Sequence, residues 1–346
     1  MIQDFKYSFL VTFVCVGLAI WWGLTTTMGV ATAIFLVLVL GIMEVSLSFD
    51  NAVVNASILK EMNEKWQKIF LTLGILIAVF GMRLVFPIVI VAVATGLGMF
   101  EVMSMALYTP TEYSRHLMEN HAGIAAFGGM FLLLVFLDFM FDYEKDVHWL
   151  KAFEARMSAM GKLDVISVLF ALIILLLLQA FLPINDETRL IILVAGLAGI
   201  VLHIAVSSLD VFFADKQEGK AVVNSVQRNG LAGFLYLEVL DASFSLDGVI
   251  GAFAITNDVV IIMLGLAIGA MFVRSLTVHL VHKGTLNEYI YLEHGAHYGI
   301  GALAVIMLFS IHYHIPEVIT GLIGVTFIIL SVISSHYHKK RLVESV

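Results

Sequence analysis

The sequence predicts an all-α membrane protein, a polytopic transmembrane helical bundle of about ten spans that forms a 5+5 inverted repeat. Hydropathy is the first observation: 60% of the 346 residues are hydrophobic and only 13% are charged, with a mean hydropathy of +0.99. Soluble domains carry about 25% charged residues. The second observation is a one-sided distribution of basic residues, and the third is the recurrence of unusual motifs in both halves.

Ten segments are apolar and long enough to span a bilayer, which requires about 18 or more residues. We expect spans near residues 8–25, 30–58, 66–98, 122–141, 165–183, 189–209, 230–256, 258–281, 296–312 and 316–335. The second and third exceed the length that a core of ~30 Å requires at 1.5 Å per residue. We therefore expect them to be tilted, broken or extended into water.

Basic residues are concentrated on one side of this topology. Fifteen of the nineteen Lys and Arg residues fall in the connections of that side, against Arg115 and Arg189 on the other, while Arg83 and Arg274 lie within spans. Cytoplasmic loops are enriched in Lys and Arg. We therefore expect a multi-pass protein of the bacterial inner (plasma) membrane with both termini in the cytoplasm.

Ten spans divide into two halves of five, and an odd number per half forces the second half into the membrane in the opposite orientation. The first half is expected over residues 1–183, with a cytoplasmic loop at 142–164. The second half is expected over 184–346, with a cytoplasmic loop at 210–229. The lipid bilayer is the expected partner; the chain has no nucleic-acid-binding motif, and nothing in it identifies a protein partner.

Two polar motifs repeat inside apolar spans. Residues 44–51 (EVSLSFDN) and 241–248 (DASFSLDG) both follow the pattern acidic-x-Ser-apolar-Ser-apolar-Asp, and the next span of each half carries an arginine, Arg83 or Arg274. Ionisable residues inside a membrane are energetically costly and mark functional sites. The duplication predicts that both halves contribute to one site.

Helical periodicity complicates the first motif. At 100° per residue, Glu44, Ser48 and Asn51 share one stripe of a continuous helix, whereas Asp50 lies about 240° round from Glu44. Either the helix contacts two polar neighbours, or it unwinds around the motif so that the carboxylates converge. Broken helices in transporters also present free carbonyls to cations.

The second motif has the same geometry. Glu238, Asp241 and Ser245 cluster on one side of a helix, while Asp247 points away. Carboxylates, hydroxyls and amides are hard oxygen ligands suited to Mn, Mg or Ca. The candidate metal ligands are Glu44, Ser48, Asp50, Asn51, Glu238, Asp241, Ser245 and Asp247, with Arg83 and Arg274 as counter-charges or gating residues. The alternative is that these acidic residues only join helices through arginine pairs.

Other chemistry is less well supported. Glu293, His294 and His297 form a candidate secondary cation or proton site. The sequence contains no HExxH, GxSxG or P-loop motif, so we expect neither an enzyme nor an ATP-driven pump. No prosthetic cofactor is expected, because the divalent cation is the substrate.

Glu44 together with Leu47-Ser48-Phe49-Asp50-Asn51 resembles the first motif of the TerC family of integral membrane proteins. Residues 238–248 resemble its second motif, from which Ser245 and Gly248 depart, and 292–297 resemble a TerC-related uncharacterised subfamily. The resemblance covers about residues 30–100 and 230–310. It implies metal-ion efflux, especially of manganese, within a wider lysine-exporter-like group. It further implies that the cation is bound by Glu44, Asp50, Asn51, Asp241 and Asp247.

The leading hypothesis is a secondary transporter that exports a divalent cation, most suitably manganese, with proton exchange as the expected driving force. Two alternatives stay open. The protein could export an amino acid or another small organic solute, or it could be a non-transporting membrane protein of stress response or assembly.

Overall fold

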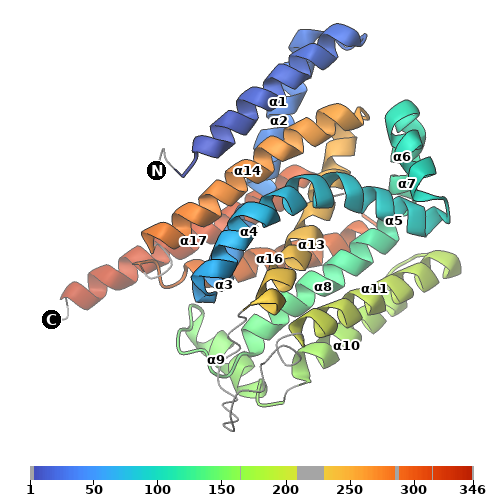
Figure 1. Ribbon diagram of the computed structural model, residues 1–346. Coiled ribbons are helices and arrows are strands. Elements are labelled where there is room, and N and C mark those ends of the chain that lie inside the picture. Colours follow the sequence, from blue (N-terminus) through green and yellow to red (C-terminus); the bar gives the residue numbers. More distant parts are fainter. Residues whose placement is uncertain (1–3, 164, 209–229, 285–287, 314, 345–346) are drawn as a thin grey trace.

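The computed structural model describes residues 4–344 apart from 164, 209–229, 285–287 and 314. All regular secondary structure in this part of the chain is helical, which confirms the predicted all-α class. The start of α1 and the end of α17 lie at the same end of the bundle (Figure 1).

The helices follow one another along the chain with short connections. They are α1 (Lys6–Thr25), α2 (Val30–Leu47), α3 (Phe49–Glu61), α4 (Glu64–Leu76), the π-helix η1 (Ile77–Val85), α5 (Phe86–Thr95), α6 (Met99–Tyr108), α7 (Pro110–Glu119), α8 (His121–Phe141), α9 (Lys151–Met160), α10 (Ile166–Phe181), α11 (Asp186–Ser207), α13 (Leu231–Ile255), α14 (Val259–Lys283), α16 (Leu292–Ser310) and α17 (Glu317–Glu344).

Within the part of the chain that the structure describes, seven helices are long and apolar enough to cross a membrane. These are α1, α2, α8, α11, α14, α16 and the segment Ile319–Arg341 of α17. By length and composition, the chain is therefore a multi-pass membrane protein. Helix α10 is apolar but has only 16 residues, and α13 has 25 residues but carries three acidic ones.

The second predicted span is broken at Ser48. Helix α2 ends at Leu47 and α3 begins at Phe49, with Ser48 at φ −105° and ψ 18° between them. Asp50 lies in the first turn of α3, where the helix dipole favours a negative charge. The break is local, because the Ser48 N–H still donates to the Glu44 carbonyl at 3.0 Å.

The third predicted span is one long helical path whose centre is a π-helix. Residues 77–85 form η1, which contains Arg83, and Pro87 follows in the first turn of α5. Proline has no N–H to donate to the carbonyl four residues earlier, here that of Arg83. π-helical segments are rare and often occur at functional sites.

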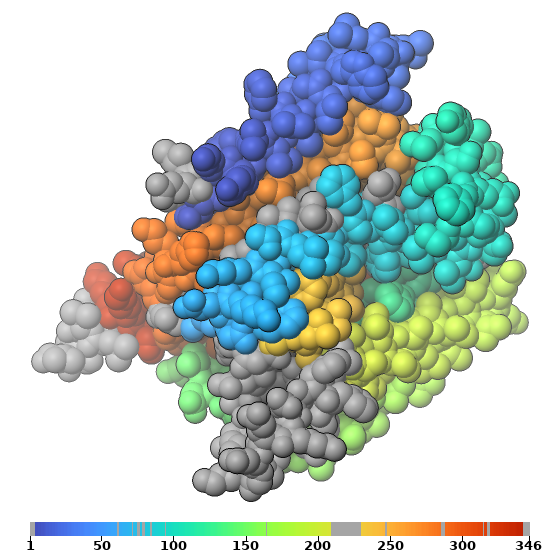
Figure 2. All heavy atoms as spheres, viewed as in Figure 1, coloured from blue at the N-terminus to red at the C-terminus, as the bar shows by residue number. Residues whose placement is uncertain are grey.

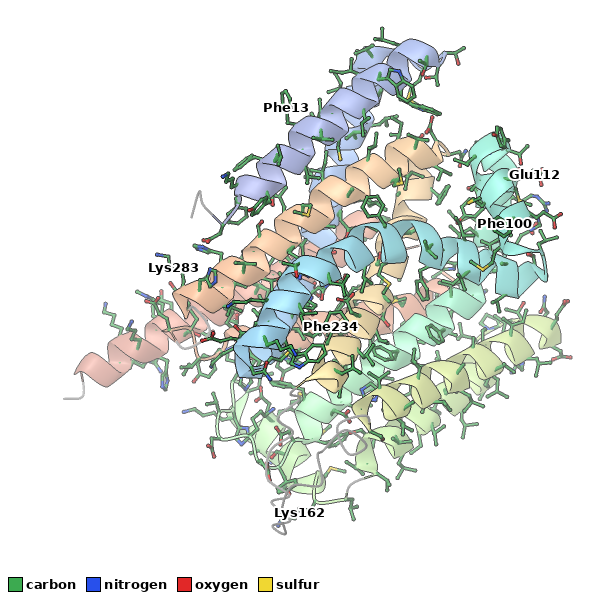
Figure 3. The ribbon with its side chains drawn as sticks, in the orientation of Figure 1. Phe13, Phe100, Glu112, Lys162, Phe234 and Lys283 are labelled. Carbon is green, nitrogen blue, oxygen red and sulfur yellow. The ribbon has the colours of Figure 1, made fainter. Side chains whose placement is uncertain are left out.

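Helices α2 and α14 pack closely through glycines. A Cβ atom placed on Gly265 would overlap Leu40, and one on Gly269 would overlap the Glu44 side chain. Helix α1 lies beside α14 at the edge of the molecule (Figure 2). Its Phe13 side chain is 81% exposed and points away from the bundle (Figure 3), as expected of a surface that contacts lipid.

Candidate functional site

The acidic residue of the first motif forms a buried ion pair. Arg83 donates from Nη2 to Oε1 of Glu44, and the two side chains are only 2% and 1% exposed. The Ser48 hydroxyl donates to the same Glu44 oxygen at 3.0 Å. The π-helix and the break at Ser48 thus each supply one donor to a single carboxylate.

The two repeated motifs meet at two contacts. Asn51 donates from Nδ2 to Oδ1 of Asp241 at 2.6 Å. A Cβ atom on Gly248 would lie 2.5 Å from Oε2 of Glu44, so this carboxylate rests against the second motif. Helix α3 approaches one turn of α13, and α2 approaches another.

The acidic and basic groups of the second half are arranged differently. Neither carboxylate oxygen of Glu238 accepts a hydrogen bond from the described residues. The Arg274 guanidinium lies 4.1 Å from the ring centroid of Phe70, a cation–π arrangement. A Cβ atom on Gly74 would lie 2.5 Å from Glu238 Oε1 and 3.3 Å from both terminal nitrogens of Arg274. Glycine at this position therefore leaves room for both groups.

A small cavity, here called the site cavity, lies where these groups converge. Its lining residues are Asn55, Phe70, Arg83, Asp241, Ala270, Val273, Arg274 and Thr277. About 20 Å³ is open to the centre of a water molecule, which is room for about one water or a small ion. The cavity therefore combines two arginines, a carboxylate, an amide and a hydroxyl.

Asp50 lies apart from this cavity. Its carboxylate accepts a hydrogen bond from the Asn51 N–H at 3.0 Å. Cβ atoms placed on Gly299 and Gly324 would lie 3.1 and 3.4 Å from Asp50 Oδ2, so this carboxylate faces α16 and α17. Helix α3 thus presents Asn51 to α13 and Asp50 to two other helices, and the break at Ser48 does not bring Asp50 to Glu44.

Two further candidates can be placed only in part. The Ser245 hydroxyl is buried, and no described residue forms a hydrogen bond with it. The side chain of Asp247 and the predicted loop 210–229 lie outside the described residues. The backbone around Asp247 belongs to α13, which continues from Leu231 to Ile255.

The two histidines of the candidate secondary site have different polar partners. His294 Nε2 lies 2.9 Å from the Val147 carbonyl and 3.3 Å from Glu154 Oε2. His297 Nδ1 lies 2.9 Å from the Glu293 carbonyl. Within the described ranges, no group of three or more His, Cys, Asp or Glu side chains is arranged to hold a metal ion.

Glu154 was not singled out from the sequence, although it has more hydrogen bonds than any other acidic side chain described in the connection 142–164. It accepts hydrogen bonds from Tyr298 and from the N–H groups of Trp149 and Leu150, and lies near His294 and Lys145. Burial alone would raise its pKa, but the bonds from His294 and Leu150 lower the pKa to about 2. No local pattern separates it from the other acidic residues of 142–164.

Other residues of the site also lie outside the motifs. Phe70 and Thr277 line the site cavity. Gly269 leaves room for the Glu44 side chain, which packs directly against its backbone. Gly265 and Gly269 form a G-x-x-x-G pattern in an apolar segment, which is typical of close helix packing in membranes. That pattern was available in the sequence, whereas nothing local indicates Phe70.

A family model described as "Protein of unknown function (DUF475)" matches residues 49–342. The match includes Arg83, Asp241 and Arg274 but begins after Glu44. No curated protein and no solved structure matches the chain. These comparisons do not connect the chain to the TerC family, and that resemblance stays a prediction. The match covers most of the sequence, so the chain belongs to the DUF475 family.

Proposed function

We propose that this protein is a secondary transporter that exports a divalent metal cation, with manganese as the best candidate. The observation that carries this proposal is the 2.6 Å hydrogen bond between Asn51 and Asp241, which joins the two repeated motifs. Asp241 also lines the site cavity together with two arginines. Buried ionisable groups in a membrane protein commonly mark an ion pathway.

The proposed architecture is ten spans in two inverted halves, residues 1–183 and 184–346, with both termini cytoplasmic. In support, each of the ten predicted apolar segments coincides with one helix or with consecutive helices. An even number of crossings also agrees with the start of α1 and the end of α17 at one end of the bundle (Figure 1).

In the proposed binding step, the divalent cation replaces the Arg83 guanidinium as the partner of Glu44. Arg83 neutralises Glu44 within the bundle. A divalent cation that approaches Glu44, Asp241 and Asn51 competes with Arg83, because a dry site cannot hold extra positive charge without cost. After the cation leaves, the carboxylates are re-paired with arginine or take up protons, which makes proton exchange a suitable drive.

Cavity size favours an inorganic ion over an amino acid. The site cavity holds about one water-sized object, whereas an amino acid needs apolar room and a partner for its carboxylate. The Arg83 guanidinium is bound to Glu44, so Arg274, the other arginine of the lining, would be that partner. The size of the cavity is therefore what disfavours an amino acid. The oxygen-rich donors suit Mn²⁺, Mg²⁺ or Ca²⁺, and we propose transport without enzymatic activity.

Flux in reconstituted vesicles tests the proposal. We expect Asp241→Asn to lower Mn²⁺ transport by about tenfold or more, which corresponds to about 1.4 kcal/mol of lost stabilisation. The matched control is Asp186→Asn, the same change at a fully exposed side chain. Equal Mn²⁺ flux in the wild type and both variants would contradict the proposal, and parallel assays with Mg²⁺, Ca²⁺ and lysine identify the substrate class.

A further inference from the structure

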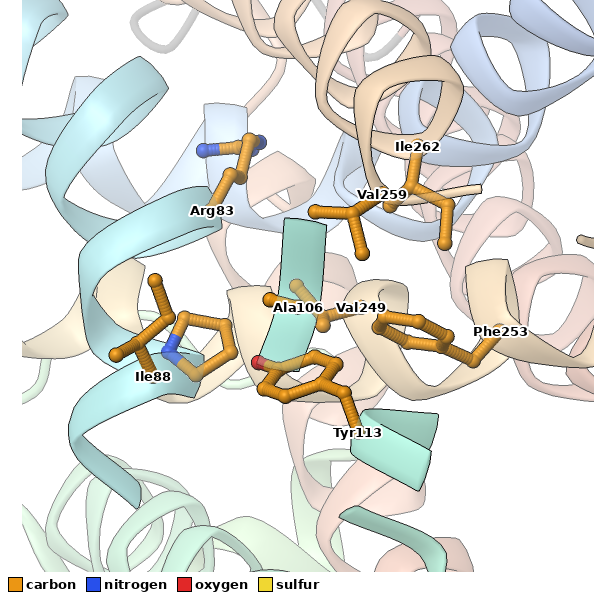
Figure 4. Close-up of a pocket in the computed structure, with 9 residues that line it drawn as sticks. Arg83, Ile88, Ala106, Tyr113, Val249, Phe253, Val259 and Ile262 are labelled. Carbon is orange, nitrogen blue, oxygen red and sulfur yellow. The ribbon is translucent and has the colours of Figure 1, made fainter. Parts of the chain in front are cut away.

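A second cavity, here called the outer cavity, lies beyond Arg83. Its lining residues are Arg83, Pro87, Ile88, Ala106, Tyr113, Val249, Phe253, Val259 and Ile262 (Figure 4). About 10 Å³ is open to the centre of a water molecule, close to the minimum that holds one water. Arg83 is a lining residue of both cavities.

Two helices give the same spacing between the cavities. On α13, Asp241 lines the site cavity and Val249 lines the outer cavity. On α14, Ala270 lines the site cavity and Ile262 lines the outer cavity. In both cases the separation is eight residues, about 12 Å at 1.5 Å per residue. Helices α3 and α4 line only the site cavity, whereas α5, α6 and α7 line only the outer cavity. The cavities are therefore stacked along the bundle.

The ion pair occupies the level between them. The Glu44 side chain contacts Gly269 of α14 and Gly248 of α13. Gly248 lies between Asp241 and Val249 on α13, and Gly269 lies between Ile262 and Ala270 on α14, so both glycines lie between the residues that line the two cavities. Glu44 also holds Arg83, so a charged pair, rather than apolar packing alone, separates the cavities.

Two aromatic rings in the lining of the outer cavity contact each other. Tyr113 of α7 and Phe253 of α13 have ring centroids 5.5 Å apart at an interplanar angle of 55°. Their side chains are buried, with 2% and 6% exposure. Helix α7 lies at the end of the bundle opposite the start of α1 (Figure 1), and Figure 4 places both rings against the cavity below Arg83.

We propose that the two cavities are parts of one translocation pathway, in which the Glu44–Arg83 pair is the central barrier and the Tyr113–Phe253 pair is the outer gate. The cation passes from the site cavity, through the level of the ion pair, to the outer cavity. This inference rests on the proposed transport function and adds the route and the two closing elements.

Cysteine accessibility tests the route. Cys15 is the chain's single cysteine and is buried, so Cys15→Ser provides a cysteine-free background. Val249→Cys then probes the outer cavity and Val273→Cys the site cavity, with a membrane-impermeant cationic thiol reagent applied to intact cells or to inside-out vesicles. We expect the two probes to react from opposite sides of the membrane.

Each barrier has its own variant. Tyr113→Ala should speed modification of Val249→Cys from the α7 side by about tenfold or more, a barrier change of about 1.4 kcal/mol, without affecting Val273→Cys from that side. Adding Glu44→Gln with Arg83→Gln, which removes both charges together, should then admit the reagent to Val273→Cys. Labelling is normalised to the folded protein recovered as a single peak in size-exclusion chromatography.

A core cysteine provides the control. Leu134→Cys, at a fully buried position of α8, should stay unmodified in every background. The proposal is overturned if Val249→Cys reacts no faster after Tyr113→Ala, or if Val273→Cys reacts from the α7 side while the ion pair is intact. Labelling requires no Mn²⁺ flux, so the expected labelling without Mn²⁺ transport would reject the substrate and keep the pathway.

Discussion

The two halves of this molecule carry nearly the same motif and use it differently. In the first half, Arg83 is bound to Glu44 and the helix is broken at Ser48. In the second half, α13 is continuous, and Arg274 lies over the Phe70 ring without an ion pair within 4.0 Å among the described residues. Matching sequences therefore do not produce matching environments.

The difference shows where charge is already compensated. Glu44 has both an arginine and a hydroxyl as partners, whereas no described residue forms a hydrogen bond to Glu238. A buried polar group without hydrogen bonds is costly. Under the proposed function, the second half is the one that gains most from a bound cation, and the first half is the one that must release its arginine.

The largest expected effect concerns the two arginines. Arg83→Met leaves Glu44 buried without its partner and should cost about 3–5 kcal/mol in free energy of unfolding. Arg274→Met removes a cation–π contact and should cost less, about 2 kcal/mol or below. Unfolding in detergent measures both. Glu44→Gln combined with Arg83→Met should recover most of the loss, and equal losses for the two arginines would contradict the asymmetry.

The next largest effect is a difference in stability between alanine variants of two asparagines in α3. Asn51→Ala removes the 2.6 Å hydrogen bond to the Asp241 carboxylate and should cost about 1.5–3 kcal/mol, as for hydrogen bonds to charged groups. Asn55→Ala is the comparison one turn later. Oδ1 of both asparagines lacks a hydrogen-bond partner among the described residues, so the difference tested is the Asn51 Nδ2 bond to Asp241. A larger loss of stability for Asn55→Ala would show that the contact between the motifs is not the important one.

A smaller effect concerns the glycines that face the two acidic side chains. A methyl group on Gly269 would overlap Cβ and Cγ of Glu44, close to the helix backbone, whereas one on Gly74 would meet only the flexible ends of the Glu238 and Arg274 side chains. Gly269→Ala should therefore cost about 1–3 kcal/mol through overpacking, and Gly74→Ala less.

Gly17→Ala is the control for both, since nothing lies within 4 Å of its added methyl group. It should be neutral or stabilise α1 by about 0.5–1 kcal/mol through helix propensity. Thermal unfolding of the three variants in one detergent gives the comparison, and an equal loss at Gly74 and Gly269 would contradict it.

Much of the fold follows from local sequence. Each apolar segment is helical because a chain in a membrane must satisfy its backbone hydrogen bonds internally. Helical periodicity also placed Asp50 away from Glu44, and in the structure Asp50 faces Gly299 and Gly324 instead. The break at Ser48 was one of two alternatives, and the similar motif in α13 has no break. The motif alone therefore does not determine the backbone.

The partners of the site depend on tertiary contacts. The repeat indicated that two motifs belong together, but it did not identify Asn51 as the donor to Asp241. The π-helix around Arg83 arises in a stretch that looks like an ordinary apolar span. Phe70 and Glu154 acquire their roles from residues that are distant in sequence, and no local pattern reveals such contacts.

Glu154 provides a contrast to Glu238, which accepts no hydrogen bond from the described residues. The Glu154 carboxylate lies outside the membrane spans and accepts several hydrogen bonds. Its pKa in the folded protein is lowered from 4.5 to about 2. A lowered pKa contributes stability that is present above the unfolded-state value and is lost as pH falls through the folded-state value. The contribution should therefore disappear between pH 4.5 and about 2.

Glu154→Gln should destabilise the docking of α9 at neutral pH, and the gap from wild type should narrow as pH falls through this window. Hydrogen exchange of residues 151–160 measures docking directly. Glu144→Gln, an exposed position in the same connection, should leave that exchange unchanged. If the difference in exchange between wild type and Glu154→Gln stayed constant between pH 4.5 and about 2, packing of the Glu154 side chain, and not its charge, would hold α9 against α16. Glu154 and Glu238 would then not differ in how well their charges are stabilised.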